Sequence, residues 1–170
     1  IQQCAGCHSR REPFEDGNPI PGTPFHDAYR LSPLRDGSYH ADGQILDEVY
    51  VYGSFLQSKM YANGVTCANC HEPHSADLRA TGNGVCTQCH SPAGNADVPT
   101  LTKKEYDDRS HHFHPVGSKG AECKSCHMIE RDYMVVDGRR DHSFRIPRPD
   151  LWQSTRAPDA CTDCHTDQSP

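Results

Sequence analysis

Hydrophobic positions form a few short runs separated by long polar stretches. The run over residues 44–52 is rich in β-branched and aromatic side chains, and it fits either a short strand or a helical turn. A helix is predicted over about residues 55–62, because Ser54 can cap its start, apolar residues follow at helical spacing and an Asn-Gly pair ends it. Residues 133–136 predict a short strand.

Prolines and glycines interrupt most of the remaining chain. Five prolines between residues 12 and 42 predict an extended, turn-rich wrap rather than regular structure. Thr66 can cap a short helix over 67–71, the charged stretch 102–109 predicts a solvated face, and prolines keep residues 141–149 extended. The predicted fold class is therefore mainly irregular, with short α-helices and little β-structure.

Composition limits what such a chain can do alone. Of its 170 residues 34% are apolar, and its mean hydropathy is −0.81. A chain of this kind struggles to bury enough surface to offset the entropy lost on ordering. The net charge is −6 and the sequence has no basic stripe, which argues against a nucleic-acid partner. No apolar run reaches the roughly 18 residues of a membrane span.

One five-residue unit, Cys-x-x-Cys-His, recurs along the chain. It occurs five times and uses all ten cysteines, so no thiol remains for a separate disulfide or a nucleophile. The units are Cys4-Cys7-His8 (unit 1), Cys67-Cys70-His71 (unit 2), Cys86-Cys89-His90 (unit 3), Cys123-Cys126-His127 (unit 4) and Cys161-Cys164-His165 (unit 5).

This unit is the attachment signature of c-type haem, in which two thiols bond the porphyrin edge and the adjacent His binds iron. Paired cysteines also occur in zinc ribbons and in secreted disulfide scaffolds. Neither alternative needs a His directly after every second Cys. We therefore expect five covalently bound haems c, with the histidines of the five units as iron ligands.

Five porphyrins can supply the core that the apolar side chains cannot. We expect the apo chain to be largely unfolded, because binding and folding are coupled in such proteins. One domain is predicted over residues 1–170, in which 1–64 wraps around haem 1 and 65–170 holds haems 2–5. Since c-type haem is attached outside the cytoplasmic membrane and Ile1 is not preceded by a signal peptide, we expect a processed or truncated secreted protein.

The sixth coordination position of each iron decides between electron transfer and catalysis. Twelve histidines occur and five belong to the units, which leaves seven for five distal positions. The seven are His26, His40, His74, His111, His112, His114 and His142. Every iron can therefore be bis-histidine and low-spin, and Met60, Met128 and Met134 are not needed as ligands. Closed irons favour electron transfer, because substrate has no place to bind.

Residues 67–90 resemble the doubled Cys-x-x-Cys-His domain of multihaem c-type cytochromes, including a His-x-Pro-His centre at 71–74. A longer match over nearly the whole chain resembles the cytochrome portion of bacterial multihaem proteins that continue into tetratricopeptide repeats. The segments that carry it include 53–60, 111–114, 126–128, 133–137, 140–142 and 145–150. This chain departs from that pattern by ending at Pro170 without helical repeats.

The resemblance implies a multihaem cytochrome c fold packed around five haems, and it implies a distal set. Related sequences share a His-x-x-His pair before a Cys-x-x-Cys-His-Met unit and an Arg-x-His after it. With the histidines before the Asp-Gly-Gln segment and after haem 2, the predicted distal ligands are His40, His74, His111, His114 and His142. His26 and His112 are spares, and His112 is an alternative to His111.

The leading hypothesis is a non-enzymatic electron-transfer cytochrome located outside the cell or in the periplasm. Its partners would be redox proteins or other copies of itself. One version makes it a subunit of an extracellular cytochrome filament, in which terminal haems near Cys4 and Cys161 meet across subunits. The alternative is a multihaem reductase for nitrite, hydroxylamine or a sulfur oxyanion, which requires one open iron.

Overall fold

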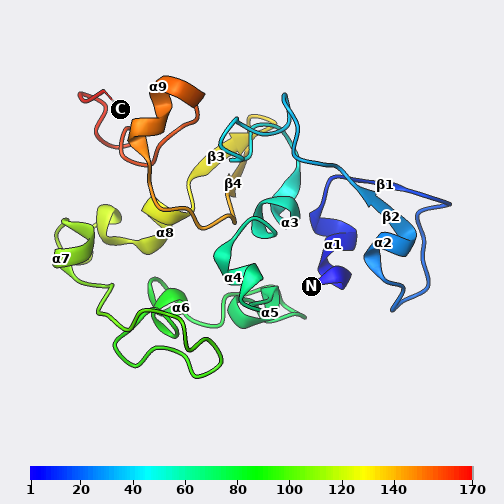
Figure 1. Cartoon of the computed structure of the whole chain (residues 1–170), viewed down its shortest axis with the longest axis horizontal. Helices are drawn as coiled ribbons and strands as arrows, with labels where there is room; N and C mark the ends of the chain where they lie inside the picture. The colour runs from blue at the N-terminus through cyan, green and yellow to red at the C-terminus, as the bar shows by residue number, and fades with distance from the viewer. Residues whose placement is uncertain (170) are drawn as a thin grey trace.

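The structure is a computed structural model, and it describes residues 1–169. Short helices and two two-stranded ribbons are joined by long loops (Figure 1), which confirms the predicted fold class. The helices are α1 Gln2–His8, α2 Phe25–Ala28, α3 Tyr50–Phe55, α4 Lys59–Ala62, α5 Cys67–Cys70, α6 Gly84–Thr87, α7 Arg109–His112, η1 Lys119–Ala121, α8 Cys123–His127, η2 Pro149–Leu151 and α9 Trp152–Thr155. No helix in the described part is long and apolar enough to cross a membrane.

The first ribbon pairs β1 (Arg11–Pro13) with β2 (Tyr29–Leu31), antiparallel, with Arg11 opposite Leu31. It corrects the prediction that residues 12–42 lack regular structure. The prolines permit the pairing because Pro13 stands at the end of its strand, where a missing N–H costs little. The guanidinium of Arg11 lies 4.8 Å from the Tyr29 ring centre, a cation–π contact across the ribbon.

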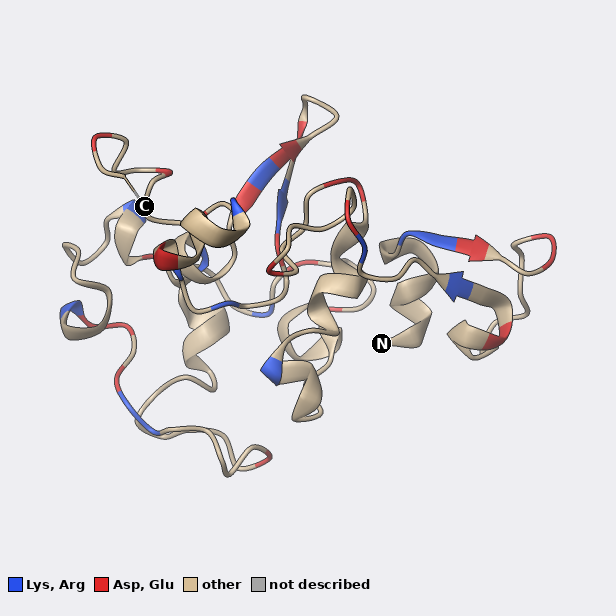
Figure 2. Ribbon diagram, turned by 45° about the horizontal axis from the view of Figure 1, so that its top comes forward, with Lys and Arg blue, Asp and Glu red and all other residues tan. Residues whose placement is uncertain are grey.

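The second ribbon pairs β3 (Glu130–Tyr133) with β4 (Asp137–Arg140). The predicted strand over 133–136 is therefore wrong, because residues 134–136 form the turn. Met134 and Val135 have φ of 54° and 74°, which is uncommon for any residue except glycine and especially for a β-branched one such as Val135. Pairing along the whole ribbon, closed by an ion pair between Arg140 and Glu130 at 2.6 Å, outweighs local strand propensity here. Figure 2 shows both signs of charge mixed along the two ribbons.

The predicted helix over 55–62 is only partly correct. The chain forms α3 and α4 instead, and Ser58 rather than Ser54 caps the second by accepting a hydrogen bond from the Tyr61 N–H at 3.0 Å. Ser54 is fully buried within α3, where its Oγ accepts from the His142 N–H at 3.0 Å. The end of the run over 44–52 forms the first turn of α3 rather than a strand. Gly64, with φ +83°, follows α4, as the predicted Asn-Gly stop requires.

Buried apolar side chains are concentrated in the N-terminal third. One cluster contains Ala5, Phe25, Tyr29 and Tyr52, and a second contains Tyr39, Ile45 and Val49. Within residues 65–169, by contrast, the buried apolar residues are only Ala121 and Ala157. The part of the chain that contains units 2–5 therefore has almost no side-chain core of its own.

Candidate haem-binding sites

Each Cys-x-x-Cys-His unit forms about one turn of helix. In units 2, 3 and 5 the N–H of the histidine donates to the carbonyl of the first cysteine, at 2.8, 2.9 and 2.9 Å, and units 1 and 4 lie within α1 and α8. Residues at i, i+3 and i+4 of a helical turn share one face. The two thiols and the imidazole of a unit are therefore presented together. At unit 2 Thr66 is the N-cap residue of α5, as predicted, and its N–H and hydroxyl both donate to Asn69 Oδ1, at 2.8 and 2.9 Å.

All ten cysteines are free thiols. Those of units 2, 3 and 4 are half-buried, whereas Cys7 in unit 1 and Cys161 and Cys164 in unit 5 are exposed. In residues 1–169, no three His, Cys, Asp or Glu side chains converge as metal ligands do around one ion. The units are thus spread through the molecule rather than gathered at a zinc-like centre.

Two contacts between imidazole rings occur among the described residues, and both join a unit histidine to a predicted distal histidine. The ring centres of His111 and His127 are 6.2 Å apart, with planes at 9°. Those of His114 and His165 are 6.0 Å apart, with planes at 41°. His111 ends α7 together with His112, and Phe113 then adopts φ 60°, a left-handed turn that sends His114 in a different direction.

Four histidines direct one ring nitrogen at a backbone carbonyl. Nδ1 of His71 is 2.9 Å from Ala76 O, that of His127 is 2.8 Å from Arg145 O, and that of His142 is 2.9 Å from Arg140 O. Nδ1 of His114 contacts the carbonyl of His112. A carbonyl only accepts, so in each neutral ring Nδ1 carries the proton and Nε2 keeps its lone pair. Metal-binding histidines usually have this arrangement.

Burial favours the neutral form of several histidines at the sites. It lowers the pKa of His90, His111 and His142. The charge of the nearby His127 lowers the pKa of His90 and His111 further. The charges of His71 and His8 lower the pKa of His142 further. Burial also lowers the pKa of His40, against the opposing charge of Asp42. Neutral imidazole is the form that binds metals.

The remaining predicted ligands lie in different surroundings. His142 lies close enough to His71 and His8 to interact electrostatically with both. Neither His40 nor His74 makes a ring contact with a unit histidine in residues 1–169, and His74 is exposed on the loop after α5. Of the spares, His26 is exposed and packs its ring edge-on against Phe25 at 5.0 Å.

His112 differs from its two neighbours. Its Nδ1 accepts a hydrogen bond from the His114 N–H at 3.2 Å, so in the neutral ring its proton is on Nε2. That tautomer has no lone pair left for a metal. The geometry therefore favours His111 over His112 as the ligand from α7.

Two residues at the sites were not singled out from the sequence. Tyr106 lies between two rings, edge-on to His90 at 5.7 Å and to His111 at 5.2 Å, although the rest of its segment is the exposed charged face that was predicted. Asn83 precedes α6 and forms hydrogen bonds to the backbone beside unit 4. Neither was identified from the sequence, because Tyr106 contacts His90 16 residues before it and Asn83 contacts Cys123 40 residues after it.

Comparison with known proteins was made for sequence and structure. The profile of a family described as Cytochrome c3 matches residues 60–137, which span units 2, 3 and 4. No curated protein matches the chain. Among solved structures, the outer cell wall cytochrome OcwA is similar over 99% of this chain, with a TM-score of 0.70 and 16% identity. The chain spans 49% of that structure's length. The match to tetratricopeptide-carrying relatives remains a prediction. The two similarities support a multihaem c-type cytochrome.

Proposed function

We propose that this chain is a pentahaem c-type cytochrome that transfers electrons through bis-histidine, low-spin haems. One observation carries the proposal. Both imidazole ring contacts, His111–His127 and His114–His165, pair a unit histidine with a predicted distal histidine. Five covalent haems c would be attached by the ten cysteines, with the unit histidines as the first axial ligands.

The separation of the paired rings fits two ligands of one metal. An imidazole nitrogen binds a transition metal at about 2 Å and lies about 1 Å from its ring centre, so two imidazoles on opposite sides of one ion have centres about 6 Å apart. The measured separations are 6.2 and 6.0 Å. Direct ring packing spans the same range. It does not explain why both contacts join one unit histidine to one predicted distal histidine.

The residues present suit covalent haem in two further respects. Nδ1 of His71, His114, His127 and His142 is engaged with a carbonyl, which leaves Nε2 for iron. The segment 65–169 exposes several large apolar side chains and buries few. A flat apolar group such as haem could cover these exposed side chains. His40, His74 and His142 would complete the distal set. When bound, haem supplies an iron that changes oxidation state by one electron.

Ligation on both sides separates electron transfer from catalysis. A reductase would require one iron that lacks a distal side chain. With five distal histidines no such iron remains, so the chain is proposed to be no enzyme. Attachment of c-type haem outside the cytoplasmic membrane supports an extracellular or periplasmic location. The partners would be redox proteins, or other copies of this chain in a filament.

Binding of carbon monoxide to the dithionite-reduced holoprotein tests the proposal. The wild type should bind none and should remain low-spin. His111→Ala and His114→Ala should each open one haem of the five to carbon monoxide. His112→Ala, from the same segment, is the matched control and should open none. Stoichiometric binding by the wild type at one haem would overturn the proposal in favour of a reductase.

A further inference from the structure

We propose that the five units stand in single file in the order of the sequence, with units 1 and 5 at the two ends. The inference rests on the proposed function only in that each unit carries a haem. It comes from contacts of the units and of the residues that flank them, which link 1 to 2, 2 to 3, 3 to 4 and 4 to 5. The sequence does not predict this order, because the units are separated by up to 63 residues from Cys4 to Cys67.

Units 1 and 2 are brought together at the N-terminus. The thiol of Cys67 lies beside that of Cys4. Tyr52 is buried in one cluster with Ala5 of unit 1, and its hydroxyl is also within electrostatic range of Cys67. The link therefore involves both the thiols and the packing around α1.

Units 2 and 3 are joined through their helical turns. The side-chain amide of Gln88, inside unit 3, donates to the carbonyl of Asn69, inside unit 2, at 3.2 Å.

Units 3 and 4 share the most contacts. Asn83 accepts from the Cys123 N–H at 2.9 Å and donates to the Ala121 carbonyl at 2.9 Å. The sulfurs of Cys86 and Cys123 lie beside each other. Tyr106 adds an aromatic bridge between His90 of unit 3 and His111, the proposed distal ligand at unit 4.

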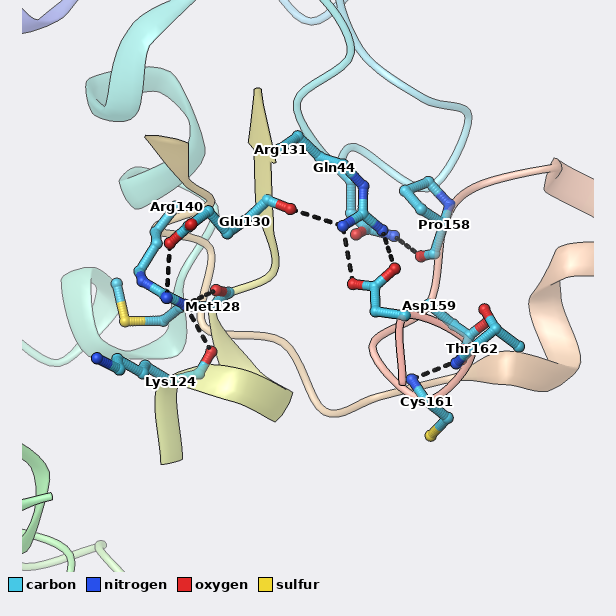
Figure 3. Close-up of polar contacts among 11 residues, drawn as sticks. Gln44, Lys124, Met128, Glu130, Arg131, Arg140, Pro158, Asp159, Cys161 and Thr162 are labelled. Carbon is cyan, nitrogen blue, oxygen red and sulfur yellow. Dashed lines mark hydrogen bonds and ion pairs between the residues drawn. The ribbon is translucent and has the colours of Figure 1, made fainter. Parts of the chain in front are cut away.

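Units 4 and 5 are held by an ion pair and by one ligand segment. Arg131, in the strand after unit 4, donates to both carboxylate oxygens of Asp163, inside unit 5, at 2.8 and 2.9 Å. Gln44 also holds the turn before unit 5, donating to the Pro158 carbonyl at 2.8 Å (Figure 3). His111 and His114, three residues apart, face the histidines of units 4 and 5.

Units 1 and 5, at the two ends of the file, are accessible to partner proteins. The exposed cysteines belong to units 1 and 5, and the two chain termini lie apart, with the C-terminus at the left edge and the N-terminus near the middle in Figures 1 and 2. A one-electron donor protein would reduce the haem at one end and a one-electron acceptor would oxidise the haem at the other. The haem held at each unit would supply an iron that takes up or gives up one electron, so electrons would pass between neighbours without any bond being made or broken.

Proton NMR of the fully reduced, diamagnetic holoprotein tests the order without any substitution. Short-range NOE contacts between cysteine β-protons and thioether protons should join only consecutive units, for example Cys4 with Cys67 and Cys86 with Cys123. A contact between non-consecutive units, or a missing contact in one consecutive pair while the other pairs are visible, would overturn the order.

A second measurement uses the potentials of the individual haems. His114→Met should raise the potential of the haem at unit 5, since Met ligation raises it. Through charge interaction the shift at unit 4 should exceed the shift at units 1 to 3. Equal or larger shifts at unit 1 would contradict a single file. Carbon monoxide binding by the wild type would refute the proposed function while leaving this order intact, so the two failures are distinguishable.

Discussion

Replacing Asn83 by Ala removes the side chain that joins unit 3 to unit 4. Its amide donates to Asp107 at 2.7 Å and to the Ala121 carbonyl at 2.9 Å, and it accepts from the Cys123 N–H at 2.9 Å. Each hydrogen bond contributes a net 0.5–1.5 kcal/mol or so. Since the bond to Asp107 is exposed, the two part-buried bonds dominate, and the side chain should stabilise the holoprotein by about 1–3 kcal/mol.

Guanidinium unfolding of the holoprotein, followed by far-UV circular dichroism and by the haem absorbance, measures this loss. Asn18→Ala is the matched control, because Asn18 is exposed and its side chain makes no hydrogen bond within the described residues. The control should change the free energy of unfolding by less than about 0.5 kcal/mol. If Asn83→Ala is no more destabilising than the control, the proposed link between units 3 and 4 is wrong.

Three further predictions concern stability. Burial raises the pKa of Tyr39 and of Tyr133 to about 12, so the stability that their protonated phenols contribute is complete below pH 10 and is lost as the pH rises towards 12. In alkaline unfolding titrations, Tyr39→Phe and Tyr133→Phe should each reduce the slope of the unfolding free energy against pH, by up to about 1.4 kcal/mol per pH unit. Phe113→Gly should be at least as stable as the wild type in thermal melts, whereas Phe113→Val should lose about 1 kcal/mol or more, because the site has φ 60° and a side chain that is 79% exposed. Ser58→Ala should cost about 1 kcal/mol through loss of the α4 cap, and an unchanged melting temperature would refute that assignment.

Local patterns in the sequence predicted the parts of the fold that depend on neighbouring residues. The helical turn after Thr66, the Asn-Gly stop after α4 and the exposed stretch 102–109 all follow from capping, turn propensity and charge. The five units themselves are visible because their chemistry is contained in five consecutive residues.

Features that depend on distant segments were missed. Ser54 could not be recognised as buried without His142, whose N–H it binds across 88 residues. The β3–β4 turn at 134–136 is decided by the ribbon's register rather than by the β-propensity of its valines. His114 was proposed as a ligand from the resemblance alone. Its ring faces that of His165 because of the left-handed turn at Phe113 and because of long-range packing.

The central claim is that this chain is a scaffold for five covalently attached haems. Intact mass spectrometry of the purified protein under denaturing conditions tests it most directly, because thioether-linked haem remains with the polypeptide. A mass increment of five haems on the 170-residue chain is expected. Fewer bound tetrapyrroles, or zinc in their place in the native protein, would contradict it.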